Sequence, residues 1–358
     1  MPQDITLLEY YIPPPHSSPT SGGRQEGGDD RLLIWVVDSK DIKIEVIPVK
    51  RDELVSKVRA YRDMVVHFEG KELKRASSEL YDILIKPVKP YIKGKRLCLV
   101  PFDALHYLSF QALWDGEKYL IEEYPIFYLP SASVMKFTLD KRRQKGEKII
   151  AFGNPDLGNP SLDLPFAQKE VEKISSLYNE PSVLYRKDAN EDIAKKKLIS
   201  RSPEQSEGEA NLPAGFDIIH FATHAEFSDI DPMYSNIRLA KGDNEDGRFE
   251  TAEIFSLNIK PYLVVLSACK TGLGAVTSGD EIIGMNRAWI YAGTPSVISS
   301  LWSVSDISTA ILMEDFYKNL KGKPKDESLR DAEISLIKNK DYSHPFYWAP
   351  FYLTGDFK

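Results

Sequence analysis

Cysteine is scarce in this chain, with only Cys98 and Cys269 among 358 residues. Two cysteines in distant parts of a sequence supply neither a disulfide framework nor a cysteine-based zinc site. Free thiols survive in a reducing compartment, so we expect a cytoplasmic protein.

Long apolar runs, excess positive charge and cofactor motifs are also missing. No apolar run has the length needed to span a bilayer, and the N-terminus lacks the pattern of a signal peptide. The net charge is −7, so neither nucleic acid nor an anionic membrane is expected as a partner. The sequence has no Gly-x-Ser-x-Gly elbow, phosphate-binding loop or dinucleotide glycine fingerprint, and we expect no cofactor.

Two short apolar runs end in reactive side chains. One covers residues 217–225 and contains His220 and His224, and the other covers residues 261–272 and contains Cys269. Each run is too short for a full helix and predicts a buried parallel strand. Open α/β sheets carry their sites at the carboxyl ends of strands, so a His and a Cys at two such ends indicate a cysteine nucleophile.

Strands alternate with helices along most of the chain, which favours an α/β fold with a mostly parallel sheet. We expect a hairpin over residues 32–47 and a new unit after the basic link at 142–148. The predicted domains are an α/β N-terminal subdomain at 1–145 and a catalytic domain at 146–358. Polar composition predicts a mobile loop, open to proteolytic nicking, at 201–215.

Each candidate residue has a structural alternative. Cys98 lies inside an apolar strand and fits a core cysteine, whereas small residues and glycines surround Cys269, which can be a core residue or a nucleophile. His220 lies in mid-strand and is expected to be structural, while His224 at the strand end can deprotonate a thiol. A spacing of four shares a face only on a helix, so we expect no metal site at these histidines.

Taken together, six ordered blocks of sequence resemble the CHAT family of caspase-like proteases, in the clan that includes separase. The resemblance covers nearly the whole chain and is carried by residues 97–113, 119–133, 152–155, 220–224, 266–274 and the paired segments 292–295 and 301–306. It implies a caspase-like three-layer sandwich at 146–358, and a degenerate relative of the same fold within 1–145.

The resemblance also implies a cysteine endopeptidase that uses a Cys-His dyad, with Cys269 as nucleophile and His224 as general base. It implies an oxyanion hole made from the backbone N–H groups of Cys269 and of Ala225, a position that is often glycine in this clan. No third catalytic residue is implied, although a backbone carbonyl could orient His224.

Specificity is expected to come from the strand after the nucleophile and from nearby acids. Residues 301–306 are similar to the Leu-Trp-Asp-Val-Thr-Asp pattern of separase, which cuts after arginine. We therefore expect cleavage after a basic residue. The predicted substrate-binding residues are Ser299, Trp302, Asp306, Asp280 and Glu281.

Two other functions stay open. A catalytically silent CHAT-like scaffold would dock partner proteins, and a cysteine acyltransferase or ligase would pass the acyl group to an amine instead of water. Family members often carry tetratricopeptide repeats or other sensor modules before this region. We accordingly expect a protein or peptide substrate and a sensor or regulatory partner.

Overall fold

The protein is described by a computed structural model that covers residues 1–13, 31–198, 215–228, 231–267, 269–270, 280–303 and 306–358. The predicted loop at 201–215 falls almost entirely outside these residues. The described residues form two compact units, one within 1–132 and one within 133–358. The domain boundary predicted at 145/146 stays a prediction.

The first unit contains five strands that pair in the order β3-β2-β1-β4-β5. β1, β2 and β3 are antiparallel neighbours, whereas β4 and β5 run parallel to β1. The predicted hairpin is confirmed as β2 and β3. The elements are β1 (Ile5–Tyr11), β2 (Leu32–Val37), β3 (Ile42–Ile47), α1 (Arg51–Val66), α2 (Gly70–Leu84), η1 (Lys89–Tyr91), β4 (Arg96–Val100), η2 (Asp103–Tyr107), η3 (Phe110–Ala112), α3 (Leu120–Glu123) and β5 (Ile126–Tyr128).

In the main sheet of the second unit, six strands pair in the order β15-β14-β12-β8-β6-β7. All neighbours are parallel except β14 and β15, which confirms the mostly parallel sheet. Its strands are β6 (Ile149–Pro155), β7 (Ser182–Arg186), β8 (Ile218–Ala222), β12 (Leu263–Leu266), β14 (Ser296–Ser300) and β15 (Phe351–Gly355). β6, β8 and β12 are buried along their whole length, which explains their unbroken apolar sequence.

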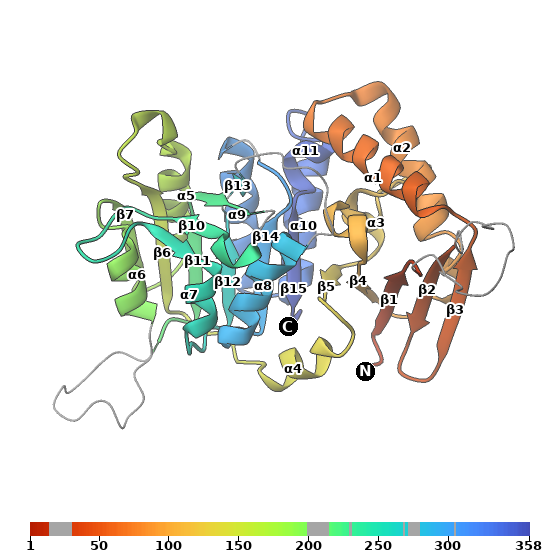
Figure 1. Cartoon of the computed structure of the whole chain (residues 1–358), viewed down its shortest axis with the longest axis horizontal. Coiled ribbons are helices and arrows are strands. Elements are labelled where there is room, and N and C mark those ends of the chain that lie inside the picture. Colours follow the sequence, from red (N-terminus) through yellow and green to blue (C-terminus); the bar gives the residue numbers. More distant parts are fainter. Residues whose placement is uncertain (14–30, 199–214, 229–230, 268, 271–279, 304–305) are drawn as a thin grey trace, which may run out of the picture. The chain divides into compact units, whose positions relative to one another are not determined.

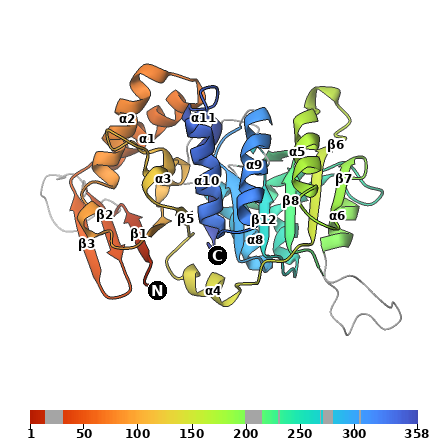
Figure 2. The ribbon, with the colours of Figure 1, turned by 180° about the vertical axis from the view of Figure 1, so that it is seen from behind.

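Helices cover both faces of this sheet and make a three-layer sandwich (Figures 1 and 2). One core lies against α6, α7 and α8, and a second, smaller one lies against α5, which packs on α9. The helices of the unit are α4 (Val134–Asp140), α5 (Pro165–Ser175), α6 (Glu191–Leu198), α7 (Thr251–Ser256), α8 (Asp280–Ala292), α9 (Asp306–Leu320), α10 (Lys325–Lys338) and α11 (Pro345–Trp348), with 3-10 turns η4 (Pro160–Leu162) and η6 (Pro232–Tyr234). None of the helices in the described ranges is both long and apolar enough to cross a membrane.

A second, smaller sheet in this unit has the order β11-β10-β9-β13. Its strands are β9 (His224–Glu226), β10 (Asn236–Arg238), β11 (Arg248–Glu250) and β13 (Cys269–Lys270). β9 follows directly on β8, and β13 follows on β12. At both places the polypeptide leaves the main sheet and enters the small one.

Gly293 makes the turn from α8 into β14. It has a φ of +128°, and a Cβ atom there would lie 2.0 Å from the carbonyl oxygen of Ile259. Only glycine fits both constraints, which accounts for the glycine at position 293.

Candidate active site

The predicted histidine strand is divided into two strands in different sheets. β8 ends at Ala222, and β9 starts at His224. Between them, buried Thr223 donates its hydroxyl to the carbonyl oxygen of Arg238 in β10, over 2.6 Å. This bond ties the bend to the small sheet, so His224 begins a strand there and does not end one in the main sheet.

Pairing within the small sheet brings the two candidate catalytic residues together. β13 runs parallel to β9, with Cys269 opposite His224 and Lys270 opposite Ala225. Neighbouring strands lie about 4.8 Å apart, so the backbones of Cys269 and His224 are direct neighbours. The structure describes Cys269 by its backbone alone.

The imidazole of His224 is oriented by a backbone carbonyl. Its Nε2 lies 2.9 Å from the carbonyl oxygen of Leu162, at the end of η4. A carbonyl oxygen only accepts hydrogen bonds, so Nε2 carries the hydrogen in this contact. In the neutral ring, Nδ1 is then the basic atom that can receive a proton.

The loop that carries Leu162 is anchored by two residues with left-handed backbone conformations. Asn154 has a φ of +45° and Arg186 a φ of +52°. The Asn154 side-chain oxygen accepts from the Leu164 N–H at 2.7 Å and from the Arg186 guanidinium at 3.1 Å. Arg186 also donates to Asp163 over 2.8 Å. These bonds fix both flanks of the loop and thereby the position of the Leu162 carbonyl. Positive φ is rare for a residue as bulky as arginine, and such outliers often occur at functional sites.

His220 is structural, as expected. It is fully buried in β8, with Nε2 2.9 Å from a carboxylate oxygen of Glu170 in α5 and Nδ1 3.0 Å from the hydroxyl of Tyr317 in α9. Burial, together with Tyr178 and Glu170, raises the pKa of Tyr317 well above its usual range, so this hydroxyl stays protonated. His220 therefore joins two helices to the strand that leads to His224.

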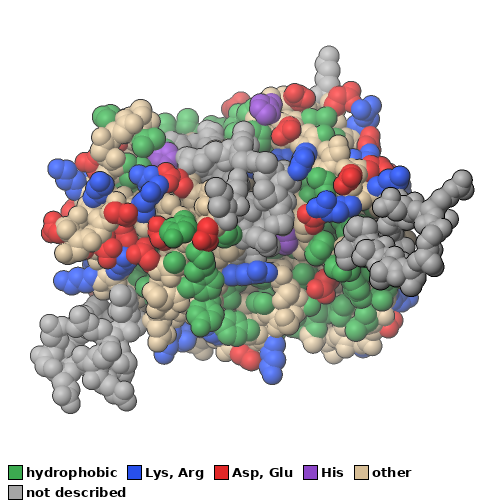
Figure 3. Space-filling view, viewed as in Figure 1, with side chains coloured by type: hydrophobic (Ala, Val, Ile, Leu, Met, Phe, Trp, Pro, Cys, Tyr) green, Lys and Arg blue, Asp and Glu red, His purple; other side chains and the backbone are tan. Residues whose placement is uncertain are grey.

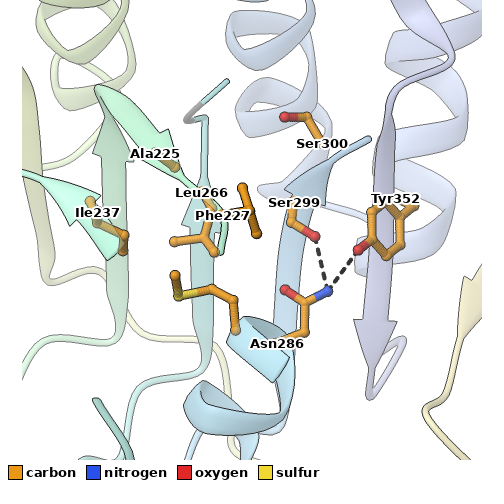
Figure 4. Close-up of a pocket in the computed structure, with 9 residues that line it drawn as sticks. Ala225, Phe227, Ile237, Leu266, Asn286, Ser299, Ser300 and Tyr352 are labelled. Carbon is orange, nitrogen blue, oxygen red and sulfur yellow. Dashed lines mark hydrogen bonds between the residues drawn. The ribbon is translucent and has the colours of Figure 1, made fainter. Parts of the chain in front are cut away.

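An apolar pocket with one polar wall lies beside β9 (Figure 4). It is small, with a cavity volume of about 10 Å³, and none of its described lining residues carries a charge. Buried Asn286 of α8 forms the polar wall by donating to the hydroxyls of Ser299 at 3.0 Å and of Tyr352 at 2.9 Å. The lining residues are Ala225, Phe227, Ile237, Leu266, Met285, Asn286, Ser299, Ser300 and Tyr352.

The predicted substrate-binding residues have different surroundings. Ser299 lines the pocket, as does Ala225 of the predicted oxyanion hole. Trp302 is buried and donates its indole N–H to the carbonyl oxygen of Phe346 at 3.1 Å. The structure describes the other three, which begin helices, only by their backbones: Asp280 and Glu281 in α8, and Asp306 in α9.

Charges of both signs are mixed on the elements around the site. In Figure 3 the Lys/Arg and Asp/Glu side chains are interspersed on the visible face, without a broad field of one sign. At the end of β9, Glu226 pairs with Arg238 and, at 3.0 Å, with Arg248. Partial burial opposes ionisation, but the two guanidinium groups outweigh it and lower the pKa of Glu226.

Cys98 is the other cysteine, and it fits a core residue. It is fully buried in β4, and burial, with a smaller effect from Glu9, raises its pKa well above the usual range of a thiol. A thiol that does not ionise is a poor nucleophile.

A cluster of three glutamates, Glu191, Glu245 and Glu253, has the spacing of a metal site. The ammonium group of Lys195 lies 2.8, 2.7 and 2.5 Å from these carboxylates. The Lys195 ammonium thus occupies the position that a metal ion would take and balances part of the negative charge of the three carboxylates. The cluster is therefore a salt-bridge network.

The fold and the site together define the class of protein. The mostly parallel sheet between two helical layers, with the His and Cys strands paired in a small sheet that follows β8 and β12, is a caspase-like α/β fold. Residues 74–356 match the CHAT domain, and this span is most of the chain, so the chain belongs to the CHAT domain family. The resemblance seen in the sequence is confirmed.

Two curated relatives and one solved structure are similar to the chain. Tetratricopeptide repeat protein 28 of Homo sapiens is 24% identical over 335 residues, which cover 77% of this chain and 13% of that protein. The Mus musculus protein of the same name is 24% identical over 336 residues, with the same coverage. The chain therefore spans a small part of the length of these relatives. The separase chain of the Saccharomyces cerevisiae separase–securin complex matches 98% of this chain, and 30% of its own length, with a TM-score of 0.60 at 11% identity. At this identity the likeness is one of fold.

Sequence reasoning missed three contributors to the site. The Leu162 carbonyl has no side-chain signal, because any residue supplies the same atom. The sequence signal for Asn286 is a polar residue among the apolar residues of α8. The signal for Arg186 is a cation at the end of a strand. Their contacts depend on chain segments that are distant in sequence.

Proposed function

We propose that the protein is a cysteine endopeptidase, with Cys269 as nucleophile and His224 as general base. The observation that carries the proposal is the parallel pairing of β9 and β13, which sets Cys269 opposite His224. The contact between His224 Nε2 and the Leu162 carbonyl supports it, because it leaves Nδ1 as the basic atom.

The reaction follows from these roles. His224 Nδ1 takes the proton of the Cys269 thiol, and the thiolate sulfur attacks the scissile carbonyl carbon. Backbone N–H groups of Cys269 and Ala225 stabilise the oxyanion. The C–N bond then breaks as the imidazolium gives its proton to the leaving amine, which leaves a thioester. A water molecule, deprotonated by His224, attacks the thioester and releases the carboxylic acid and the free thiol.

For specificity we propose a preference for a basic residue before the scissile bond. The proposed acids are Asp306, Asp280 and Glu281, which begin α9 and α8, and Ser299 and Trp302 belong to the adjoining segment. The described lining of the pocket near Ala225 is neutral, so the proposed selectivity depends on these three carboxylates.

We propose a protein or peptide as substrate and a sensor or regulatory protein as partner. The similar human protein has tetratricopeptide repeats in its name, which is consistent with a repeat module as the regulator. A thiolate nucleophile needs reduced Cys269, so we propose a reducing compartment such as the cytoplasm as the site of action.

The test is active-site labelling together with cleavage of a denatured-protein or peptide library. A thiol-directed electrophile should label Cys269 and spare Cys98, which is buried and poorly ionised. Cys269→Ala and His224→Ala should each abolish cleavage, and the double variant should be little worse than either single variant, because the two residues act as a unit. Cys98→Ala is the matched control and should keep full activity.

Two results would contradict the proposal. Substrate cleavage by the Cys269→Ala protein would show that Cys269 is not the nucleophile. A Cys269 that reacts no faster than a free thiol peptide, with no cleavage by the wild-type chain, would favour the catalytically silent scaffold. Transfer of the acyl group to an added amine, seen as product mass, would favour the acyltransferase.

A further inference from the structure

An exposed apolar row lies on the edge strand of the first unit. Ile42, Ile44 and Val46 of β3 are 64, 53 and 52% exposed. β3 is the last strand of its sheet, and no strand within the described residues pairs with its outer edge (Figure 1). Single exposed apolar residues are ordinary, but three in a row on an unpaired edge are the pattern of a strand-pairing site.

Nothing in the backbone of β3 blocks such pairing. All six of its residues pair with β2 without a register shift, so the strand is regular and has no bulge. Proline first appears at Pro48, after the strand ends. Bulges and prolines are two of the devices that natural proteins use to protect edge strands.

The two faces of β3 differ in character. Ile42, Ile44 and Val46 share one face, and Lys43 and Glu45 alternate with them on the other. On that second face the Lys43 ammonium lies 4.3 Å from the centre of the Tyr91 ring, and the nearby Glu45 carboxylate raises the pKa of Tyr91. The charged pair is thereby held close to the strand.

We propose that β3 pairs with β3 of a second copy of this chain, antiparallel and about a two-fold axis at Ile44. In this register Ile44 lies opposite Ile44 of the partner subunit, and Ile42 lies opposite Val46. Lys43 then lies opposite the partner's Glu45, and by symmetry this ion pair occurs twice. The six apolar side chains form one continuous stripe on the other face.

Charge selects this register over its neighbours. A shift by two residues in one direction sets Lys43 against Lys43, and a shift in the other direction sets Glu45 against Glu45. Directly opposed like charges destabilise a strand pair, whereas directly opposed opposite charges stabilise it. The segment Ile-Lys-Ile-Glu-Val-Ile is therefore its own complement in one register, which is why a second copy is favoured over an unrelated strand.

Charge reversal gives the decisive experiment, with sedimentation velocity over a concentration series as the readout. The wild-type chain should dimerise. K43E sets Glu against Glu twice and E45K sets Lys against Lys twice, so each variant alone should be monomeric. An equimolar mixture of the two should form a heterodimer, and the double variant K43E/E45K should recover the homodimer. K57E, the same charge change on α1, is the matched control and should leave the dimer intact.

Cross-linking tests the register independently of the charge variants. In a C269S background, I44C should form an intermolecular disulfide, because opposed residues of antiparallel strands have Cβ atoms about 4.5–5.5 Å apart. S39C, in the exposed β2–β3 turn, should not, since the proposed register separates the two Ser39 positions by about 30 Å.

Three outcomes would overturn the proposal: a wild-type chain that is monomeric at every concentration, a K43E protein that still dimerises, or S39C that cross-links as fast as I44C. Thermal melting of each variant separates a lost interface from a lost fold. The proposal does not depend on the proteolytic function, and no assay of cleavage enters its test.

Discussion

Glu333 of α10 is a buried carboxyl group whose replacement should stabilise the protein. It is 1% exposed, and neither of its oxygens has a hydrogen-bond partner among the described residues. Leu329 and Leu336, one turn away on either side, are also buried, so Glu333 belongs to the apolar face of the helix. Burial raises its pKa well above the usual range, although the charge of Arg330 acts in the opposite direction.

The sign of the pH effect follows from this shift. Above the ordinary glutamate pKa the unfolded chain has released the Glu333 proton while the folded protein still holds it. The unfolded state then binds fewer protons, so stability falls as pH rises, by up to about 1.4 kcal/mol per pH unit until the folded-state pKa is reached. The Glu333 contribution is therefore most favourable below the ordinary glutamate pKa and declines as pH rises above it.

Glu333→Leu should raise the free energy of unfolding by about 1–3 kcal/mol at pH 7, the scale of an unpaired buried polar group. Glu333→Gln should raise the free energy of unfolding by less, because an amide in the same place still lacks hydrogen-bond partners. It should nevertheless remove the Glu333 component of the pH dependence. Urea unfolding at several pH values between 5 and 8 measures both effects. Glu172→Leu, an exposed glutamate on α5, is the matched control and should change stability by a few tenths of a kcal/mol.

A loss of stability in Glu333→Leu, or a gain that is the same at every pH, would refute this reasoning. A loss would mean that Glu333 contributes favourably to the folded state, and a pH-independent gain would mean that folding does not shift the Glu333 pKa.

Two further predictions depend on the proposed activity. Asp306→Ala should lower kcat/KM for substrates with a basic residue before the cut by about 1–3 kcal/mol in transition-state terms, and a substrate library cleaved mainly after Asp or small apolar residues would contradict the basic preference. Arg186→Asn keeps a residue that tolerates positive φ but removes the guanidinium that anchors the Leu162 loop, so kcat should fall roughly 10–100-fold with little change in KM. The exposed control Arg143→Asn should not change kcat. An unchanged kcat in Arg186→Asn would show that Arg186 does not position the Leu162 carbonyl.

The sequence predicts the second unit well where apolar runs decide the structure. β8 and β12 lie within the two predicted runs because strands buried on both faces must be apolar throughout. The break between β8 and β9 was not predictable, because it depends on a hydrogen bond from Thr223 to a strand 15 residues further along the chain. Short-range periodicity does not report such a partner.

The candidate site divides in the same way. His224 and Cys269 are recognisable by residue type and position, and His220 was rightly read as a core residue from its apolar neighbours. The carbonyl of Leu162 and the anchoring role of Arg186 have no signature in the sequence, since they arise where the β6–α5 loop meets β9. The acids proposed for specificity remain predictions.

The pairing of β13 with β9 comprises two residue pairs, Cys269–His224 and Lys270–Ala225, whereas β6 and β8 are joined by five. A ladder of two pairs contributes little backbone free energy, so it can fray while the main sheet stays intact. The distance between the two candidate catalytic residues is thus decoupled from the global stability of the unit. A ligand that binds the paired state of β9 and β13 modestly more tightly than the frayed state can therefore change the fraction of molecules in which the two residues are paired. Such a shift does not require the core of the unit to change.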